Sequence, residues 1–278
     1  MKAAFLVLIL FLLLILSGLY VWHLLDKQAA RAEADRLLAF RQAEPQRFSN
    51  TLVEDLPEPA RRYFRFAIKE GTPLNKVAEI SMTGQFGMGD KNAPNYLPMK
   101  AEQVLAAPEG FVWQMSGGSG VMRISGSDSA NWTRFWLAGV VPVARAGGTS
   151  DHTLSGFGRY ISEAVLWTPA AVLPAPGVAW EAVDENTARL TMEHNGNRQS
   201  VDVSVDAQGR PVRIVLERWS NANADGIYRF QPFGGDLSEF REFEGFTLPT
   251  YVEAGNLIGT DDYFPFFIAN VTNVRFSQ

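Results

Sequence analysis

The first 25 residues constrain the fold of this chain more than any other segment. From Ala3 to Leu25, no Asp, Glu, Lys or Arg interrupts a run dominated by Leu, Ile, Val and Phe. About 20 helical residues, at roughly 1.5 Å each, cover the roughly 30 Å hydrocarbon core of a bilayer. The run therefore predicts a transmembrane anchor over residues 1–25, which would hold the rest of the chain beside a membrane.

A cleaved secretory signal is the alternative reading of this segment. Such a signal has an apolar core of roughly 7–15 residues and a cleavage site with small residues. Here Leu19-Tyr20-Val21-Trp22 continues the run with bulky side chains, and the Ala-rich stretch 29–34 follows Asp26 and Lys27. The length favours an uncleaved signal-anchor. The chain has no Cys, which excludes an anchor through an acylated Cys.

The flanking charges leave both orientations of the anchor open. Lys2 precedes the run, whereas Lys27, Arg31, Arg36 and Arg41 follow it, and the basic residues alone favour a cytoplasmic C-terminal side. Long domains, however, cross largely regardless of flanking charge, and a short positive N-terminus usually stays inside. We expect a single-pass membrane protein with its domain outside the cytoplasm.

The composition of the chain excludes some partners. The net charge is −5, and we find no basic tract, zinc-ligand spacing or aromatic RNA-binding motif, so no nucleic acid is expected. Nor does any motif imply a cofactor or a metal ion. Residues 26–55 are expected to form a solvated helical stalk, and residues 56–278 a single β-rich domain.

A short helix is predicted to open this domain, with Pro59 in its first turn and Gly71 near its end. Four basic residues fall on one side of this helix and aromatic residues on the other. The basic residues are Arg61, Arg62, Arg65 and Lys69. They would form either a membrane-facing surface against anionic head groups or an ordinary solvated face.

Alternating apolar and polar residues predict antiparallel strands from Val77 to the end of the chain. The expected strands include Met99–Leu105, Gly110–Met115, Gly120–Ile124, Asn131–Leu137, Val140–Ala144, Thr187–His194, 201–206, 212–216, Ile227–Gln231, Ser238–Glu244, Thr247–Ala254 and Phe264–Phe276. One amphipathic helix, from Ser150 or Asp151 to before Pro169, interrupts them. Arg159 and Glu163 on this helix are expected to form a modest surface pair.

So many consecutive strands must curl to hide their edges. The predicted fold is mainly β: a strongly curved antiparallel sheet or incomplete β-barrel with one intercalated helix, preceded by a transmembrane helix.

The sequence contains no catalytic motif that we recognise. Its three His residues are scattered, and no nucleophile elbow or metal-binding pattern is present. Aromatic residues offer another kind of site, because they can line an apolar pocket, although most such side chains simply fill cores. The pocket candidates are Trp132, Trp136, Trp167, Phe230, Phe233, Phe264 and Phe266.

Several phrases of the sequence resemble a family of uncharacterised bacterial membrane-anchored proteins known only as a domain of unknown function. They are PMKAEQ at 98–103, LAGVVPVARAGG at 137–148, VAWEAVD at 178–184, and the segments PFGG at 232–235, YFPFF at 263–267 and RF at 275–276. This resemblance implies a bacterial inner membrane but no activity. The hairpin of 201–206 and 214–219 is also similar to the lipoprotein-carrier and lipoprotein-sorting fold, an unclosed barrel that binds acyl chains.

Three functions follow as hypotheses. The first is a membrane-tethered, non-catalytic binding module for a lipid acyl chain or another apolar ligand. The second is an envelope protein-interaction or structural module. The third is a hydrolase that uses paired carboxylates, for which no cleft can be located from the sequence. An enzyme is therefore the less favoured reading.

Overall fold

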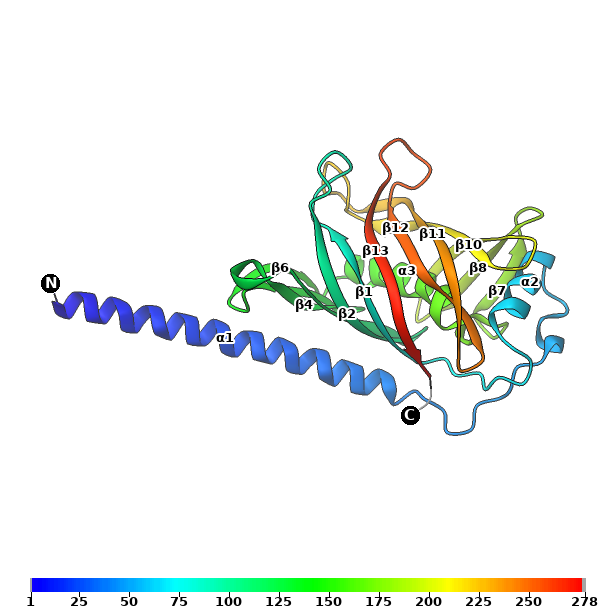
Figure 1. Cartoon of the computed structure of the whole chain (residues 1–278), viewed down its shortest axis with the longest axis horizontal. Helices are drawn as coiled ribbons and strands as arrows, with labels where there is room; N and C mark the ends of the chain where they lie inside the picture. The colour runs from blue at the N-terminus through cyan, green and yellow to red at the C-terminus, as the bar shows by residue number, and fades with distance from the viewer. Residues whose placement is uncertain (1, 277–278) are drawn as a thin grey trace.

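The computed structural model describes residues 2–276 of the chain. Within this range a long N-terminal helix, α1 (Lys2–Leu38), leads into a β domain with two further helices, α2 (Glu58–Ala67) and α3 (Ser150–Trp167). Short 3₁₀ turns lie at Asn50–Val53, Gly120–Met122 and Pro169–Val172. The N-terminal half of α1 projects from the domain (Figure 1).

In the part of the chain that the structure describes, thirteen strands form one antiparallel sheet. They are β1 (Ala78–Gly87), β2 (Tyr96–Ala106), β3 (Gly110–Gly117), β4 (Ile124–Ser129), β5 (Trp132–Leu137), β6 (Val141–Gly147), β7 (Val178–Ala182), β8 (Thr187–His194), β9 (Asn197–Val205), β10 (Pro211–Ser220), β11 (Arg229–Phe243), β12 (Phe246–Asn256) and β13 (Phe264–Arg275). The sheet confirms the predicted mainly β, unclosed antiparallel architecture.

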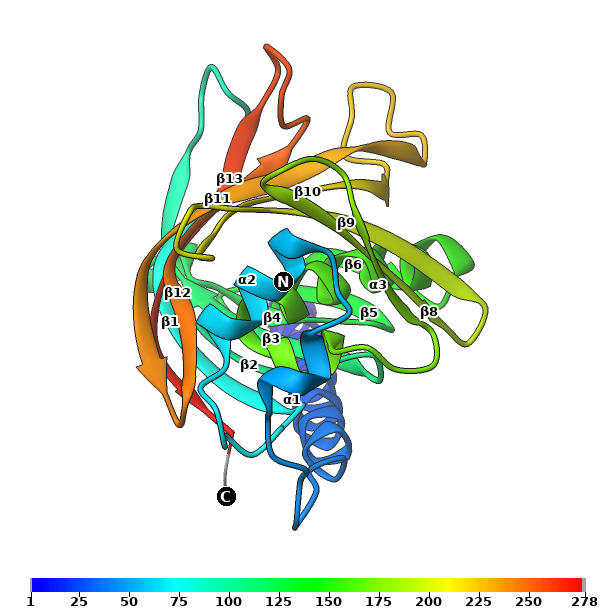
Figure 2. The ribbon, with the colours of Figure 1, turned by 90° about the vertical axis from the view of Figure 1, so that its right-hand side faces the viewer.

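The order of the strands explains how the sheet surrounds a core. It runs β6-β5-β4-β3-β2-β1-β13-β12-β11-β10-β9-β8-β7, so two meanders are joined where the first strand pairs with the last. Because β6 and β7 are the opposite edges, α3 must carry the chain across the sheet between them. The sheet curls around α2 and α3 (Figure 2). A helix thus covers the apolar concave face.

The helices α2 and α3 contact each other inside this curl. The Tyr63 hydroxyl of α2 donates to the carbonyl oxygen of Val165 in α3 at 2.6 Å. Tyr63, Phe64, Ile161 and Trp167 are almost fully buried in the same core. The aromatic face predicted for α2 is therefore the face that packs inward.

The C-terminal part of α1 lies on the outer face of the sheet and is not a solvated stalk, so that expectation is wrong. Its buried residues recur every three or four positions: His23, Asp26, Ala30, Glu33 and Leu37. Ala30 and Leu37 pack against Val104, Ala106 and Val112 of β2 and β3. Two members of this stripe are carboxylates, so it does not stand out in the sequence as an apolar face.

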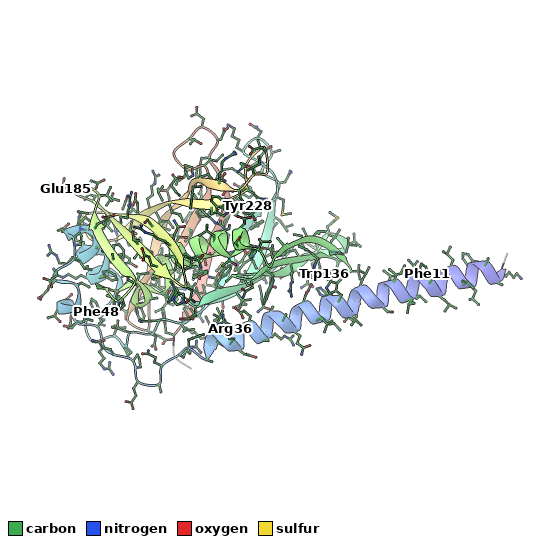
Figure 3. The ribbon with its side chains drawn as sticks, turned by 180° about the vertical axis from the view of Figure 1, so that it is seen from behind. Phe11, Arg36, Phe48, Trp136, Glu185 and Tyr228 are labelled. Atoms are coloured by element: carbon green, nitrogen blue, oxygen red, sulfur yellow. The ribbon has the colours of Figure 1, made fainter. Side chains whose placement is uncertain are left out.

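Asp26 fixes α1 to the edge of the sheet. Its carboxylate is 2.6 Å from Arg145 and 3.2 Å from Arg134, and it accepts a hydrogen bond of 2.9 Å from the Trp136 indole. The Arg145 guanidinium also lies over the ring of Trp22 at 4.2 Å. Figure 3 shows Trp136 beside α1, with Phe11 on the projecting part of the helix.

Two strand boundaries differ from those predicted. Residues 120–122 form a 3₁₀ turn, and the strand expected there begins only at Ile124. The two strands expected at 227–231 and 238–244 are one long strand, β11, although Pro232 and Gly234-Gly235 looked like breaks. Pro232 is tolerated because the pairing with β12 starts at Phe233, so its missing N–H costs no ladder bond there.

Candidate functional site

A cavity of about 240 Å³ lies inside the curl, between α3 and the concave face of the sheet. Its walls come from both meanders and are mostly aromatic or aliphatic. The aromatic residues that line it are Phe86, Trp113, Phe135, Trp167, Phe233, Phe266 and Phe267. Such apolar enclosures with a few polar groups are the usual form of small-ligand sites.

Small residues create the hollow. Gly235 of β11 and Ala254 of β12 face each other in the strand register, and both line the cavity. A Cβ atom added to Gly235 would come within 2.8 Å of the Ala254 Cβ, which shows how closely the two strands approach there. The small side chains of this pair therefore leave space on the cavity side of β11 and β12.

The aromatic rings of the wall contact one another in series. Phe86 lies 5.6 Å from Phe266 and 6.0 Å from Trp113, and Trp113 lies 6.2 Å from Phe267, each distance joining ring centroids. Phe266 continues the series to Phe233 at 6.2 Å. These spacings are typical of favourable edge-to-face and offset pairs, so the wall is a connected apolar surface.

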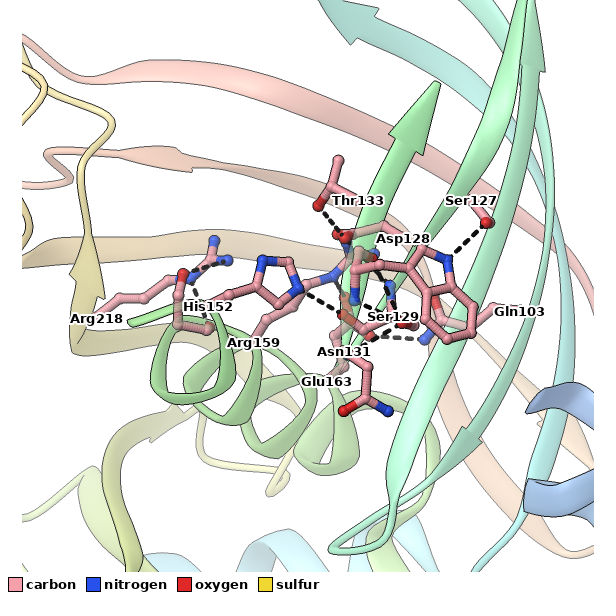
Figure 4. A network of polar contacts seen from close by, with 12 residues as sticks. Gln103, Ser127, Asp128, Ser129, Asn131, Thr133, His152, Arg159, Glu163 and Arg218 are labelled. Carbon is pink, nitrogen blue, oxygen red and sulfur yellow. Dashed lines mark hydrogen bonds and ion pairs between the residues drawn. The ribbon is translucent and has the colours of Figure 1, made fainter. Parts of the chain in front are cut away.

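An ion-pair network borders the cavity (Figure 4). Arg159 of α3 forms ion pairs with Asp128 of β4 and, at 2.8 Å, with Glu163 one helical turn later. Asp128 also accepts a bond of 2.5 Å from Thr133, and Glu163 accepts one of 2.6 Å from Gln103. The expected modest surface pair is thus part of a network that ties α3 to three strands.

Burial and charge act in opposite directions on Arg159. Burial opposes its charge, but the attraction of Glu163 and Asp128 outweighs it and raises the pKa of Arg159. Its guanidinium also lies over the Phe111 ring at 4.5 Å and the Trp113 ring at 5.3 Å. Both carboxylates are therefore held by Arg159, in the ordinary manner of a structural ion pair.

Arg218 of β10 also lines the cavity but is held differently. Its guanidinium donates to the Ser155 carbonyl oxygen at 3.3 Å and to the Ser155 hydroxyl at 3.4 Å, and it lies 5.0 Å from the Phe233 ring centroid. Burial, aided by the nearby charge of Arg159, lowers the pKa of Arg218 to about 10. Arg218 still carries its proton at neutral pH.

A glycine lets Arg218 approach the helix. A Cβ atom on Gly158 of α3 would lie 3.5 Å from Cγ of Arg218 and 2.7 Å from Oε1 of Gln199. The absence of a side chain at this position leaves room for both strands against α3. Gly158 weakens the helix by about 1 kcal/mol relative to Ala, but it permits this close packing.

The histidines and carboxylates do not gather into a metal site within residues 2–276, where no group of three or more potential ligands is found. His152 is buried, with Nε2 3.2 Å from the Ser129 carbonyl oxygen. His194 lies 3.8 Å from Glu109 at the surface.

The structure brings three of the seven predicted pocket residues together. Trp167, Phe233 and Phe266 line the cavity. Trp132 and Trp136 do not line it: Arg134, between them on β5, and Trp136 bind Asp26 of α1 on the outer face. In a strand, residues two apart share a face, so Trp132 points the same way.

The other two pocket candidates also lie elsewhere. Phe230 is 54% exposed and packs edge-on against Trp219 at 5.0 Å. Phe264 lies 6.0 Å from the Tyr96 ring and does not line the cavity.

The four basic residues at α2 lie at the end of the domain away from the projecting half of α1 (Figure 1). Arg62 pairs with Glu58 at 2.8 Å and donates to the carbonyl oxygens of Asp206 and Glu185, so it supports two strand turns. Arg61 donates to the Glu54 carbonyl oxygen, and Arg65 and Lys69 are exposed. This position does not support a membrane-facing role for them.

Several cavity residues escaped the sequence analysis: Phe86, Trp113, Phe135, Phe267 and Arg218. A signal for Arg218 was present in the sequence. Ile214, Leu216 and Arg218 are spaced two apart on β10, which places the arginine on the apolar face. A charge at the end of an inward-facing series is a stronger indication of a site than another aromatic residue.

Comparisons with known proteins identify the family but no ligand. Residues 46–268 match the model of a family described as "Family of unknown function (DUF6544)", which confirms the resemblance to a domain of unknown function. No curated protein matches the chain. A solved LolA superfamily protein from Nitrosomonas europaea is similar over 79% of this chain and 92% of that chain, with 9% identity and a TM-score of 0.39.

Proposed function

This chain belongs to the family of unknown function DUF6544, and from its geometry we propose that it is a membrane-tethered, non-catalytic module that binds a lipid acyl chain or another apolar ligand. The aromatic-walled cavity between α3 and the sheet carries this proposal. Protein interiors are normally packed as densely as organic crystals, so a hollow of about 240 Å³ is unusual for a purely structural core.

The size of the cavity limits the ligand. At roughly 30 Å³ per group, the share of liquid volume that one water takes, the cavity holds about eight non-hydrogen atoms. A chain of this length, or the first part of a longer one, would fill it. The aromatic part of the wall suits the apolar part of such a ligand, and the charged side chains of the lining remain available for polar contacts.

The tether is the N-terminal half of α1. Among residues 2–276, α1 is the one helix long and apolar enough to cross a membrane. The contacts of Asp26 with Arg134, Arg145 and Trp136 join the same helix to the domain. We propose a bacterial inner membrane with the domain outside the cytoplasm, so the cavity would hold its ligand at one membrane.

The carboxylates of the domain favour binding over hydrolysis. Asp128 and Glu163 are the acids that line the cavity, and both are ion-paired with Arg159. A carboxylate hydrolase needs one acid kept protonated and another left free to act as base or nucleophile. A shared structural arginine opposes both requirements, because it stabilises the charged form of each acid.

Native mass spectrometry of the full chain, purified in a mild detergent, tests the proposal. We expect a copurifying amphiphile. We expect Ala254→Phe to reduce the affinity roughly tenfold, or about 1.4 kcal/mol, because its ring would occupy space that the ligand needs. Leu166→Trp fills the cavity from the helix side and should reduce the affinity to a similar extent. The control is Ala179→Phe at an exposed position of β7 that does not line the cavity. Wild-type protein that neither carries nor takes up an apolar molecule would refute the proposal.

A further inference from the structure

Arg218 is a hydrogen-bond donor on the cavity wall whose partners do not match its charge. Among the described residues, its guanidinium bonds to neutral groups of Ser155, at 3.3 and 3.4 Å. A guanidinium group donates and cannot accept. The cavity therefore offers a charged donor to whatever enters it.

The charge of Arg218 has no direct counter-ion. Among residues 2–276, no carboxylate lies within 4.0 Å of its guanidinium, since Asp128 and Glu163 both pair with Arg159 instead. Burial lowers the pKa of Arg218, and the more distant charges of Asp128 and Glu163 offset this effect only in part. A part-buried arginine without a direct counter-ion, at the wall of a cavity, is therefore positioned to bind an anion that enters it.

Arg159, in the same cavity, is an arginine whose charge is balanced by direct partners. It forms ion pairs with two carboxylates in the network of Figure 4. The four charges that line the cavity, Asp128, Arg159, Glu163 and Arg218, sum to zero. Both carboxylates, however, pair directly with Arg159, so the positive charge without a direct ion pair is that of Arg218.

The inference that follows rests on the proposed function. We infer that the cavity takes an amphiphile with an anionic head group, carboxylate or phosphate, whose charge is bound by the guanidinium of Arg218 while its chain lies among the aromatic residues. A charge-assisted bond to a guanidinium is about twice as strong as a neutral one, so an anion is favoured over an alcohol or ester of the same length.

Octanoate and 1-octanol are matched probes for this inference, because they share a chain length and differ in head group. Isothermal titration of the full chain in nanodiscs, with empty nanodiscs as the blank, compares their affinities. We expect octanoate to bind at least roughly tenfold more tightly than 1-octanol, because a hydrogen bond between two charged groups is stronger than one to a neutral hydroxyl. Octyl phosphate, run in parallel, distinguishes the two anionic heads.

Variants of β10 assign the effect to Arg218. Arg218→Met should remove the preference for octanoate and leave the affinity for 1-octanol nearly unchanged, whereas Arg218→Lys should keep part of the preference. The control is Arg213→Met, which removes an exposed arginine of the same strand that pairs with Asp236. Circular dichroism and octanol binding verify that each variant is folded, and Arg218→Gln replaces Arg218→Met if the latter is not.

The outcomes separate this inference from the proposed function. Equal binding of both probes by wild-type protein, or a preference that survives Arg218→Met, would overturn the anionic head group while leaving the apolar cavity in place. Binding of neither probe by folded wild-type protein would overturn the proposed function and this inference together. A preference that Arg213→Met abolishes as well would assign it to surface charge.

Discussion

At the scale of single residues, the two arginines of the cavity carry opposite roles. Arg159 satisfies two carboxylates and stabilises the fold, whereas Arg218 has no charged partner among the described residues. The difference does not come from residue type or depth. It comes from position, because Asp128 of β4 and Glu163 of α3 pair directly with Arg159, whereas no carboxylate within residues 2–276 lies within 4.0 Å of the Arg218 guanidinium.

Replacement of Arg159 should destabilise the protein strongly. Arg159→Met leaves Asp128 and Glu163, whose side chains are only 19% and 13% exposed, without their counter-ion. Removing one partner of a buried pair costs about 3–5 kcal/mol, and urea unfolding followed by tryptophan fluorescence measures the loss. Arg189→Met, which breaks the more exposed pair with Asp202, should cost less than about 1 kcal/mol. Similar losses in both variants would contradict this assignment.

At the scale of elements, α1 has two different halves. The N-terminal half is exposed on every side and the C-terminal half presents a buried stripe to β2, β3 and β4. A helix that is apolar all round suits lipid, whereas one with a single buried face packs on protein. One continuous helix therefore combines an apolar segment that suits lipid with a segment that packs on the sheet.

Loss of Asp26 should loosen this joint. Asp26→Ala removes the acceptor of Arg134, Arg145 and Trp136, which we expect to cost about 2 kcal/mol of local stability because Arg134 and Arg145 remain partly solvated. Hydrogen exchange over residues 26–38, in nanodiscs, should accelerate roughly 30-fold. Asp35→Ala, at an exposed position of the same helix, should leave the exchange unchanged. Equal protection in the two variants would count against the ion-pair joint.

At the scale of the whole molecule, the chain joins its two meanders into one unclosed sheet by pairing its first strand with its last. β1 and β13 pair over residues 79–86 and 267–275, while the two free edges, β6 and β7, are bridged by α3. The cavity lies inside the curl of this sheet, and its lining comes from both meanders.

The proposed membrane tether makes a prediction for the whole chain. Alkaline extraction of membranes should leave the protein in the pellet with an intact mass of 30.8 kDa, because a helix that spans the bilayer resists removal of peripheral contacts. A chain that lacks residues 1–25 should appear in the supernatant, provided it folds by circular dichroism. Release of a shortened wild-type protein would indicate a cleaved signal peptide instead.

Most of the helices and strands could be predicted from local patterns of the sequence. The uninterrupted apolar run required a helix, and the period-2 alternation in β8, β9 and β10 required strands wet on one side, because both patterns follow from where side chains point in regular backbone. The sequence also indicated curling, since so many consecutive strands would otherwise expose long edges.

Which side chains contact one another depends on the three-dimensional arrangement of the strands and helices. Trp132 and Trp167 are equally aromatic, yet the first lies on the outer face and the second in the cavity wall, because strand register and the crossing of α3 set their directions. The carboxylate of Asp26 likewise lies on a buried face of α1, because the sheet places Arg134 and Arg145 opposite it. Long-range pairing, such as that of β1 with β13, leaves no local pattern, and the cavity depends on it.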